Sequence, residues 1–162
     1  IIRAIVELRT MTSEPFQLQI VGDGPLRGEL QMLTRELGVA DVIQFVGAVS
    51  PSEIPNYLQH AYIFVRPSRS EGLGSSFLES MAMSVPIIGT LVGGIPDFLH
   101  DGKTGLAVRV DDVHDLAQKI FQLMQDSQLY ERLSTSAFEL VRRDYQWDNI
   151  ATTMGKLFYS IL

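Results

Sequence analysis

The chain has 162 residues, of which 46% are hydrophobic, and its formal net charge is −6. This length is sufficient for one compact domain with a hydrophobic core. An acidic chain without a run of basic residues is not typical of a protein that binds the nucleic-acid backbone. The absence of cysteine excludes disulfides, thiolate catalysis and cysteine-ligated zinc.

Residues 1–11 predict a helix, because Ile1, Ile2, Ile5, Val6 and Leu8 form an apolar stripe. The chain starts at Ile1 without an initiator methionine. We therefore expect it to be part of a longer protein.

Short apolar runs then alternate with helical patterns. The runs have strand length, β-rich composition and flanking turn residues, and they span 16–21, 42–47, 61–67, 85–90 and 105–110. Helical patterns occupy 26–38, 51–61 and 75–83, with stop signals at Gly38 and Pro86. This order predicts an α/β fold: a Rossmann-like parallel sheet with helices on both faces and a ligand crevice at the carboxyl ends of its strands.

Three further helices are predicted at 112–126, 128–144 and 146–162. Asp112 precedes an apolar-periodic segment and is expected to be an N-cap. Trp147 is expected to anchor the last helix. Because no linker or repeat interrupts the chain, residues 1–162 are predicted to be one domain with a helical C-terminal tail.

Two glycine pairs follow predicted strands. Gly22 and Gly24 spell G-x-G-x-x-x-G, which differs from the dinucleotide fingerprint. The pair fits either a tight turn with positive φ or a loop that binds a ligand. A ligand-binding loop here would be consistent with a dinucleotide-dependent oxidoreductase, which stays open as an alternative function. Gly93 and Gly94 likewise permit either a plain turn or close approach of backbone to a ligand.

The stretch "EGLGSSFLE" places Glu71 and Glu79 on either side of a glycine loop. On one helix, residues at this spacing would be about 12 Å apart and so could not form a carboxylate dyad. If a strand ends at Pro67 and a helix starts at Ser75 or Ser76, Glu71 precedes the helix and Glu79 lies in its first turn. Free N–H groups at such a helix start favour an anion, and ionised carboxylates accept hydrogen bonds from hydroxyls. A nucleoside diphosphate sugar has this pattern of groups.

A simpler interpretation of the same residues stays open. Ser76-x-x-Glu79 also matches a capping box, in which Glu79 bonds back to the Ser76 N–H. Glu71 would then be an ordinary solvated acid.

Residues 18–30, 43–90 and 92–112 resemble successive blocks of the C-terminal, donor-binding domain of retaining GT-B glycosyltransferases of family 4, also called glycosyl transferases group 1. The most specific likeness is the E-x7-E motif at Glu71 and Glu79. The resemblance implies a hexosyltransferase that retains anomeric configuration. It also implies that the N-terminal acceptor-binding domain is absent and that this fragment alone is inactive.

The resemblance assigns a role to each matched position. Glu71 would be the catalytic residue that contacts the donor sugar, and Glu79 would bind the ribose hydroxyls. The diphosphate would be held by loop amides from Gly72, Leu73, Gly74, Ser75 and Ser76. Phe45 to Gly47 would line the base pocket, and Gly22 to Gly24 would face the cleft between the domains.

Arg69 lies in the E-x7-E loop and could approach a phosphate, with Arg66 a less certain second. Each arginine could instead be solvated or paired with a carboxylate. His60, His100 and His114 are dispersed, so we expect no metal and no cofactor beyond a UDP- or GDP-linked donor.

No apolar run reaches the roughly 18 residues of a membrane span. We expect a cytoplasmic protein without nucleic-acid partners, any peripheral membrane contact being made by the missing domain. A non-catalytic sugar-nucleotide-binding or interaction module stays open as an alternative, since only the missing half would distinguish it.

Overall fold

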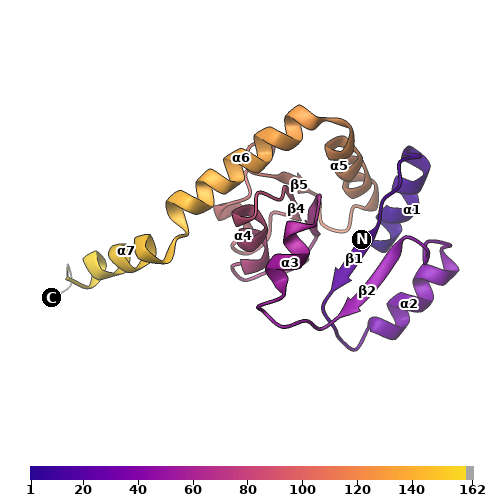
Figure 1. The fold of residues 1–162 in the computed structure, drawn as a ribbon, viewed down its shortest axis with the longest axis horizontal. Helices are drawn as coiled ribbons and strands as arrows, with labels where there is room; N and C mark the ends of the chain where they lie inside the picture. The colour runs from indigo at the N-terminus through magenta and orange to yellow at the C-terminus, as the bar shows by residue number, and fades with distance from the viewer. Residues whose placement is uncertain (160–162) are drawn as a thin grey trace.

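The computed structural model describes residues 1–159, in which strands and helices alternate as predicted (Figure 1). The strands of this part of the chain are β1 (Leu18–Val21), β2 (Ile43–Gly47), β3 (Phe64–Arg66), β4 (Ile87–Thr90) and β5 (Leu106–Val108). Its helices are α1 (Ile2–Met11), α2 (Arg27–Glu36), α3 (Ile54–Gln59), α4 (Ser75–Ala82), the 3-10 helix η1 (Ile95–Asp97), α5 (Val113–Gln125), α6 (Ser127–Asp144) and α7 (Trp147–Tyr159). Each strand lies inside its predicted run, and η1 was not predicted.

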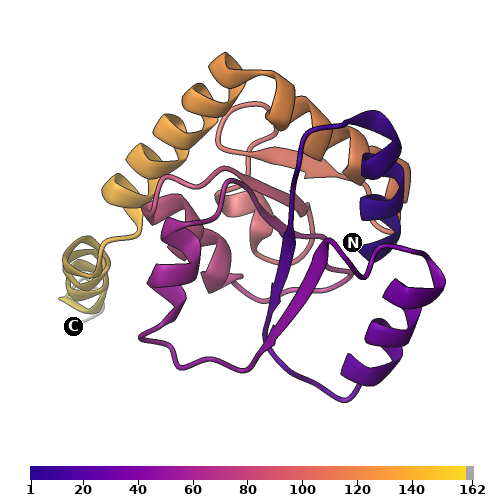
Figure 2. The same cartoon turned by 45° about the vertical axis from the view of Figure 1, so that its right-hand side comes forward.

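All strand pairings in these residues are parallel, which confirms the predicted fold class. The strands form two hydrogen-bonded sheets rather than one, with the orders β1-β2 and β3-β4-β5. In Figures 1 and 2 the β1–β2 pair lies to one side of the three-stranded sheet, and β1 is the nearer strand of the pair.

Strand β4 shows how helices cover both faces of the larger sheet. Ile88 packs into a cluster that includes apolar residues of α1 and α5. Its neighbour Ile87 points to the opposite face and packs with Phe77 and Met81 of α4 and with Leu140 of α6. All four residues of β4 are buried, as expected for a central strand of a parallel sheet.

Two of the predicted helix boundaries are confirmed. Gly38 follows the end of α2 with φ of +68°, a conformation that glycine adopts without steric cost. Asp112 caps α5, because its Oδ1 accepts from the N–H of Asp115 at 2.9 Å.

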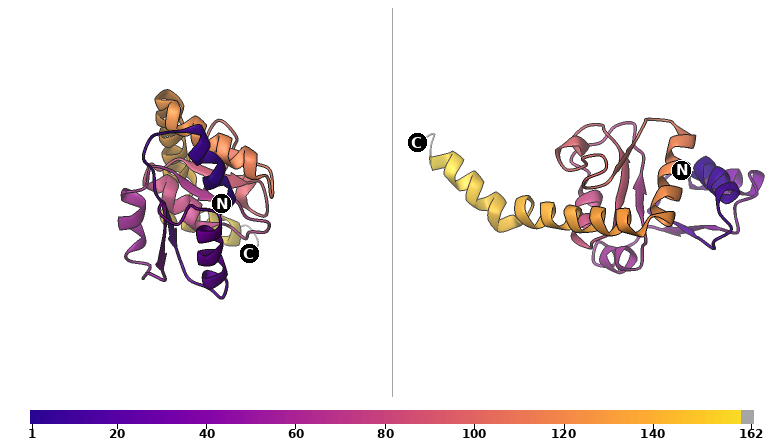
Figure 3. Two further views of the ribbon diagram at one scale, coloured as in Figure 1. Left: turned by 90° about the vertical axis from the view of Figure 1, so that its right-hand side faces the viewer. Right: turned by 90° about the horizontal axis from the view of Figure 1, so that it is seen from above.

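Helix α7 extends away from the body of the molecule beyond α6 (Figure 3). None of its described residues is buried, and Trp147 is 83% exposed. The prediction that Trp147 anchors the last helix is therefore wrong for this chain, since nothing among residues 1–159 covers it. The predicted helix 146–162 is seen from Trp147 to Tyr159, and residues 160–162 lie outside the described part.

We find no helix within residues 1–159 that combines the length and the apolar character needed to cross a membrane.

Candidate functional site

The E-x7-E loop joins β3 to α4. Strand β3 ends at Arg66 and α4 begins at Ser75, so Glu71 precedes the helix as predicted. Glu79 is the fifth residue of α4 and therefore opens its second turn, rather than lying in the first turn as predicted. Gly74 immediately before the helix has φ of +72°, and a Cβ there would lie 2.6 Å from Ile95 Cδ1.

Glu71 is held in place by two neighbouring side chains. Its side chain is only 13% exposed, and its Oε2 lies 2.9 Å from Arg66 Nη2. The same oxygen accepts a hydrogen bond from Ser68 Oγ at 3.2 Å. Glu71 is thus not the freely solvated acid of the simpler interpretation, because its carboxylate is oriented at the mouth of the loop.

Arg66 also contacts the first turn of α4. Its Nη1 donates to Ser76 Oγ at 2.8 Å, while its Nη2 bonds Glu71. One guanidinium group therefore joins the loop to the helix start and brings positive charge to the place where an anion is favoured.

Arg69 has a different partner. Its Nε lies 2.9 and 3.0 Å from the two carboxylate oxygens of Asp111, in the segment between β5 and α5. Of the roles that the sequence leaves open, the carboxylate pair is the one present in this structure. Phosphate contact by Arg69 stays a prediction.

The capping-box interpretation of Ser76 and Glu79 is wrong. The residue before α4 is Gly74, and no side chain in the described part of the protein caps the helix. Ser76 Oγ instead accepts from Arg66. The exposed Glu79 carboxylate has neither a hydrogen bond nor an ion pair within residues 1–159, so it is free to accept hydrogen bonds from a ligand.

A glutamate that bonds back to the serine three residues before it occurs elsewhere, at Ser50 and Glu53 in the turn before α3. Glu53 Oε2 accepts from the Ser50 N–H at 2.9 Å and from Ser50 Oγ at 2.6 Å. Its sequence signal, Ser-Pro-Ser-Glu at 50–53, was not recognised, because the predicted helix 51–61 included most of the turn that precedes α3. The same S-x-x-E spacing thus closes one turn and leaves Glu79 unpaired.

The loop is supported by the turn that follows β4. Gly94 N donates to Gly72 O at 2.9 Å, and a Cβ on Gly93 would lie 1.8 Å from Glu71 O. The backbone of Gly93 and Gly94 therefore packs directly against the E-x7-E loop, because neither residue has a side chain that would keep the two segments apart.

The other predicted donor-binding segments, the loop after β1 and the end of β2, lie beside each other. Gly22 N donates to Gly47 O at 2.8 Å, and Arg27 Nη2 donates to Phe45 O at 3.3 Å. A hollow of about 310 Å³ opens next to them. Its lining is largely apolar and comes from Ile20, Gly22, Asp23, Gly24, Pro25, Leu26, Arg27, Leu30 and Phe45.

Two N–H groups of the glycine loop after β1 already have hydrogen-bond partners within the chain. Gly22 N bonds Gly47 O, and Gly24 N donates to Asp23 Oδ1 at 2.8 Å. This Gly24 N–H bond, together with the Arg27 guanidinium at 2.8 Å, lowers the pKa of Asp23. The geometry favours the turn interpretation over a diphosphate-binding dinucleotide loop, since two of its amides are already engaged.

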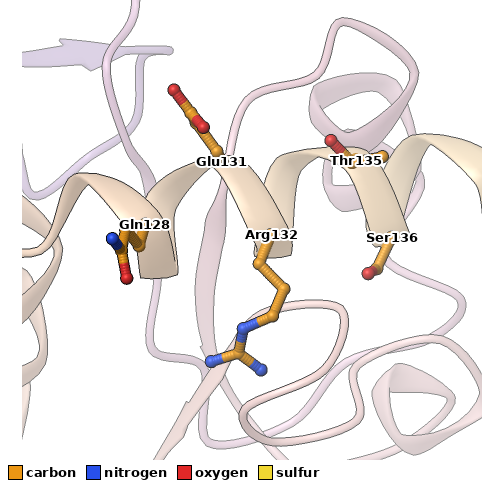
Figure 4. A pocket seen from close by; sticks show the side chains of 5 residues that line it. All are labelled: Gln128, Glu131, Arg132, Thr135 and Ser136. Carbon is orange, nitrogen blue, oxygen red and sulfur yellow. The ribbon is translucent and has the colours of Figure 1, made fainter.

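A second hollow of about 390 Å³ lies along α6, far from these loops in sequence. Figure 4 shows Arg132 pointing to one side of the helix and Glu131 to the other. Arg132 Nη1 donates to Gly102 O at 2.8 Å, so we assign this side chain to packing. No predicted site residue lines this hollow.

The residues that the structure describes include no group of three or more histidine, aspartate or glutamate side chains placed to hold a metal ion.

The family model described as "Glycosyl transferases group 1" matches residues 1–140 of the chain. The chain belongs to this family. A similar curated relative is the GDP-mannose-dependent alpha-(1-6)-phosphatidylinositol monomannoside mannosyltransferase of Mycobacterium tuberculosis, which is 34% identical over 145 residues. That match covers 85% of the chain and 38% of the relative, so this glycosyl transferases group 1 chain spans well under half of the relative's length.

Solved structures of glycosyltransferases share the fold. The C-terminal domain of the group 1 protein LpcC from Francisella tularensis superposes with a TM-score of 0.82 at 26% identity, over 90% of this chain and 77% of that one. HepE from Anabaena, solved with UDP and glucose, gives a TM-score of 0.87 at 18% identity, over 97% of this chain and 44% of HepE. These neighbours confirm the GT-B type of α/β fold.

Proposed function

We propose that residues 1–162 are the donor-binding domain of a retaining hexosyltransferase that takes its sugar from a nucleoside diphosphate. In this proposal the acceptor is bound by a separate N-terminal domain of a longer protein, and the chain by itself transfers no sugar. Support comes from membership of the family, from the relative named as GDP-mannose-dependent, and from the neighbour solved with UDP and glucose.

The observation that carries the proposal is the contrast between the two glutamates. Glu71 is 13% exposed and fixed by Arg66, whereas Glu79 is exposed and unpaired within the described residues. Between them lies the start of α4, which lacks a side-chain cap in this part of the chain. In our proposal Glu71 faces the hexose, the helix N–H groups hold the diphosphate, and Glu79 accepts from the ribose hydroxyls.

The same arrangement suits the chemistry of transfer. The anomeric carbon exchanges its bond to the diphosphate oxygen for a bond to the acceptor oxygen, whose hydroxyl proton is released to solvent, and negative charge develops on the leaving diphosphate. Arg66, already bonded to Ser76 at 2.8 Å, and the N–H groups of α4 would stabilise that charge without reorganising, which is how fixed donors lower a barrier. We expect nucleotide binding to survive EDTA, since these groups need no metal.

The test is calorimetric titration of the folded chain with UDP, UDP-glucose, GDP and GDP-mannose, with NAD as the probe for an oxidoreductase. Glu79→Ala should weaken the nucleoside diphosphate that binds by about 10- to 150-fold, the range for losing a hydrogen bond to a charged group. Glu131→Ala is the matched control, because Glu131 is the exposed fifth residue of α6 as Glu79 is of α4. Unchanged affinity in Glu79→Ala would contradict the ribose role.

Glu71→Ala tests the sugar end of the same site. It should remove most of the affinity difference between the nucleotide sugar and the matching diphosphate, whereas Glu79→Ala should weaken both alike. Without the other domain the sugar is loosely held, and the affinity difference between nucleotide sugar and diphosphate is then under ~1 kcal/mol. The test is therefore whether Glu71→Ala reduces this difference, not by how much. Equal weakening of both ligands by Glu71→Ala would place both acids on the nucleoside and refute the proposed donor orientation.

A further inference from the structure

Strand β4 ends in a threonine that lies inside the protein. Thr90 is only 1% exposed, and the sheet fixes its backbone, because it is the register partner of Val108 in β5. The Thr90 hydroxyl donates to the carbonyl oxygen of Ser68, which lies 22 residues earlier in the chain. Buried hydroxyls normally have a hydrogen-bond partner, and the partner of this one belongs to the E-x7-E loop.

This hydrogen bond continues the connection between β3 and β4 beyond the end of their ladder. The last register pair of the two strands is Arg66 with Gly89. The next residue after Arg66 is Pro67, which has no N–H to continue a ladder. Thr90 reaches the residue after it, Ser68, with its side chain. The beginning of the loop is therefore tied to a strand whose four residues are all buried.

Ser68 in turn contacts the carboxylate of Glu71. Its hydroxyl donates to Glu71 Oε2 at 3.2 Å, and Arg66 Nη2 lies 2.9 Å from the same oxygen. Within residues 1–159 no hydrogen bond engages the other oxygen, Oε1. The torsion that turns a carboxylate has broad preferences of its own, so two partners on Oε2 restrict the direction in which Oε1 points.

The two partners of Glu71 differ in how firmly they are held. The Arg66 side chain is 47% exposed and divides its guanidinium group between Glu71 and Ser76. Ser68 has a short side chain, and its backbone is bonded to the buried Thr90 hydroxyl. A long exposed side chain retains more rotamer freedom than a short one, so Ser68 is the more rigid of the two partners.

We propose that Thr90 is a positioning residue for Glu71, acting through Ser68 and without contact with the substrate. The inference rests on the proposed function, in which Glu71 faces the hexose. By holding Ser68 in place, the Thr90 hydroxyl sets where the Glu71 carboxylate lies relative to the start of α4. A residue of β4, outside the E-x7-E loop, thus determines how well the sugar is held compared with the nucleotide.

Calorimetric titration distinguishes this role from a general effect on the fold. Thr90→Val keeps the branched shape of the side chain and removes the hydroxyl. It should remove most of the affinity difference between the nucleotide sugar and the matching diphosphate, a difference of at most about 5-fold in this chain. Affinity for the diphosphate itself should be retained per folded molecule, because Glu79 and the N–H groups of α4 remain.

Two further variants make the titration independent of any one substitution. Thr90→Ser retains the hydroxyl and should retain the affinity difference. Ser68→Ala removes the second hydrogen bond of the same path, so it should reproduce the loss seen in Thr90→Val.

A double-mutant cycle tests the link without any ligand. The equilibrium constant of unfolding is measured by urea denaturation for Thr90→Val, Glu71→Ala and the double variant. Residues in one hydrogen-bonded network are energetically coupled, so the double variant should depart from additivity by about 2-fold or more in this constant. The departure should shrink when all four proteins also carry Ser68→Ala.

The matched control is Thr34→Val. Thr34 is likewise a buried threonine whose hydroxyl donates to a backbone carbonyl, that of Gln31, but it lies in α2 rather than beside the E-x7-E loop. The effect of Thr34→Val on unfolding should add to that of Glu71→Ala without coupling. The affinity difference between nucleotide sugar and diphosphate should not change.

Additive effects of Thr90→Val and Glu71→Ala on unfolding would overturn the proposal, because Thr90 would then support the fold alone. Equal weakening of both ligands by Thr90→Val would overturn it as well, as would a coupling that Ser68→Ala leaves at full size. If the wild type binds no nucleotide, the proposed function fails, and the cycle still decides whether Thr90 acts on Glu71. The two proposals therefore fail separately.

Discussion

Helix α4 begins differently from α5 and α6. Asp112 caps α5 by accepting from Asp115 N at 2.9 Å, and Asp126 caps α6 by accepting from Leu129 N at 2.8 Å. Helix α4 instead follows Gly74 in the left-handed conformation, with no side-chain cap from any described residue. Helices α5 and α6 thus have a carboxylate at the N-terminus, whereas the N-terminal N–H groups of α4 have no side-chain acceptor in the described part of the chain.

The difference shows that some helix starts are determined by neighbouring residues and others by tertiary contacts. An Asp cap needs only residues within one turn of the helix, so α5 and α6 start correctly whatever surrounds them. The start of α4 depends on Gly93 and Gly94 from another loop and on Arg66 from β3. An uncapped helix start held by distant residues suits a ligand site, because its N–H groups stay available.

The largest expected effect follows from Gly93→Ala. The added Cβ would lie 1.8 Å from Glu71 O, and φ at this residue is +57°. Overpacking together with a strained φ should lower the free energy of unfolding by about 2–4 kcal/mol, measured by urea denaturation. Gly28→Ala in α2 is the control, since its Cβ meets no atom within 4 Å, and it should stabilise the chain by about 0.5–1 kcal/mol. A Gly93→Ala protein as stable as the wild type would show that the two loops do not depend on each other.

The next effect concerns Arg66→Met, which leaves the largely buried Glu71 carboxylate without its cation. The loss should be about 1–3 kcal/mol of unfolding free energy, and adding Glu71→Gln should recover part of it. Arg69→Met is the matched control, because the Arg69 and Asp111 side chains are 80% and 60% exposed and such pairs contribute at most about 1 kcal/mol. Equal losses from both arginines would mean that Arg66 does no more for the loop than a surface ion pair.

A smaller effect is expected from Asp126→Ala, which removes the cap of α6. The cost should be about 1 kcal/mol, or roughly 2–4 °C in Tm for a chain of this size, and Asp126→Asn should retain most of the stability. Nucleoside diphosphate affinity per folded molecule should not change. Weaker nucleotide binding in Asp126→Ala would undermine the distinction between capped and open helix starts.

The smallest effect is a pH dependence at the cap of α5. The hydrogen bond from Asp115 N–H lowers the pKa of Asp112, with a further contribution from Arg109. Because the folded pKa is depressed, the stabilisation is present above the unfolded pKa near 4 and disappears as pH falls through the folded pKa. Asp112→Asn should therefore be slightly less stable than the wild type at neutral pH and equal to it at low pH in paired thermal melts. A constant difference at every pH would contradict this origin.

The amino-acid sequence by itself determined the features that depend on neighbouring residues. Alternating strand and helix periodicities predicted the α/β order, Gly38 marked the end of α2, and Asp112 marked the start of α5. These features can be predicted from sequence because backbone φ, helix capping and side-chain periodicity depend on residues within one or two turns of each other. The E-x7-E motif was likewise visible as two acids around a glycine loop.

Only the tertiary structure decided which partner each charged group has. Arg69 pairs with Asp111, 42 residues away, whereas Arg66, the less certain candidate from sequence, joins Glu71 to Ser76. The spacing of Ser76 and Glu79 matches that of Ser50 and Glu53, yet only Glu53 accepts a hydrogen bond from the N–H of its serine. The exposure of Trp147 and the division of the sheet were also not predicted. Each of these depends on how distant elements pack, and packing decides which of several equally good local partners is within reach.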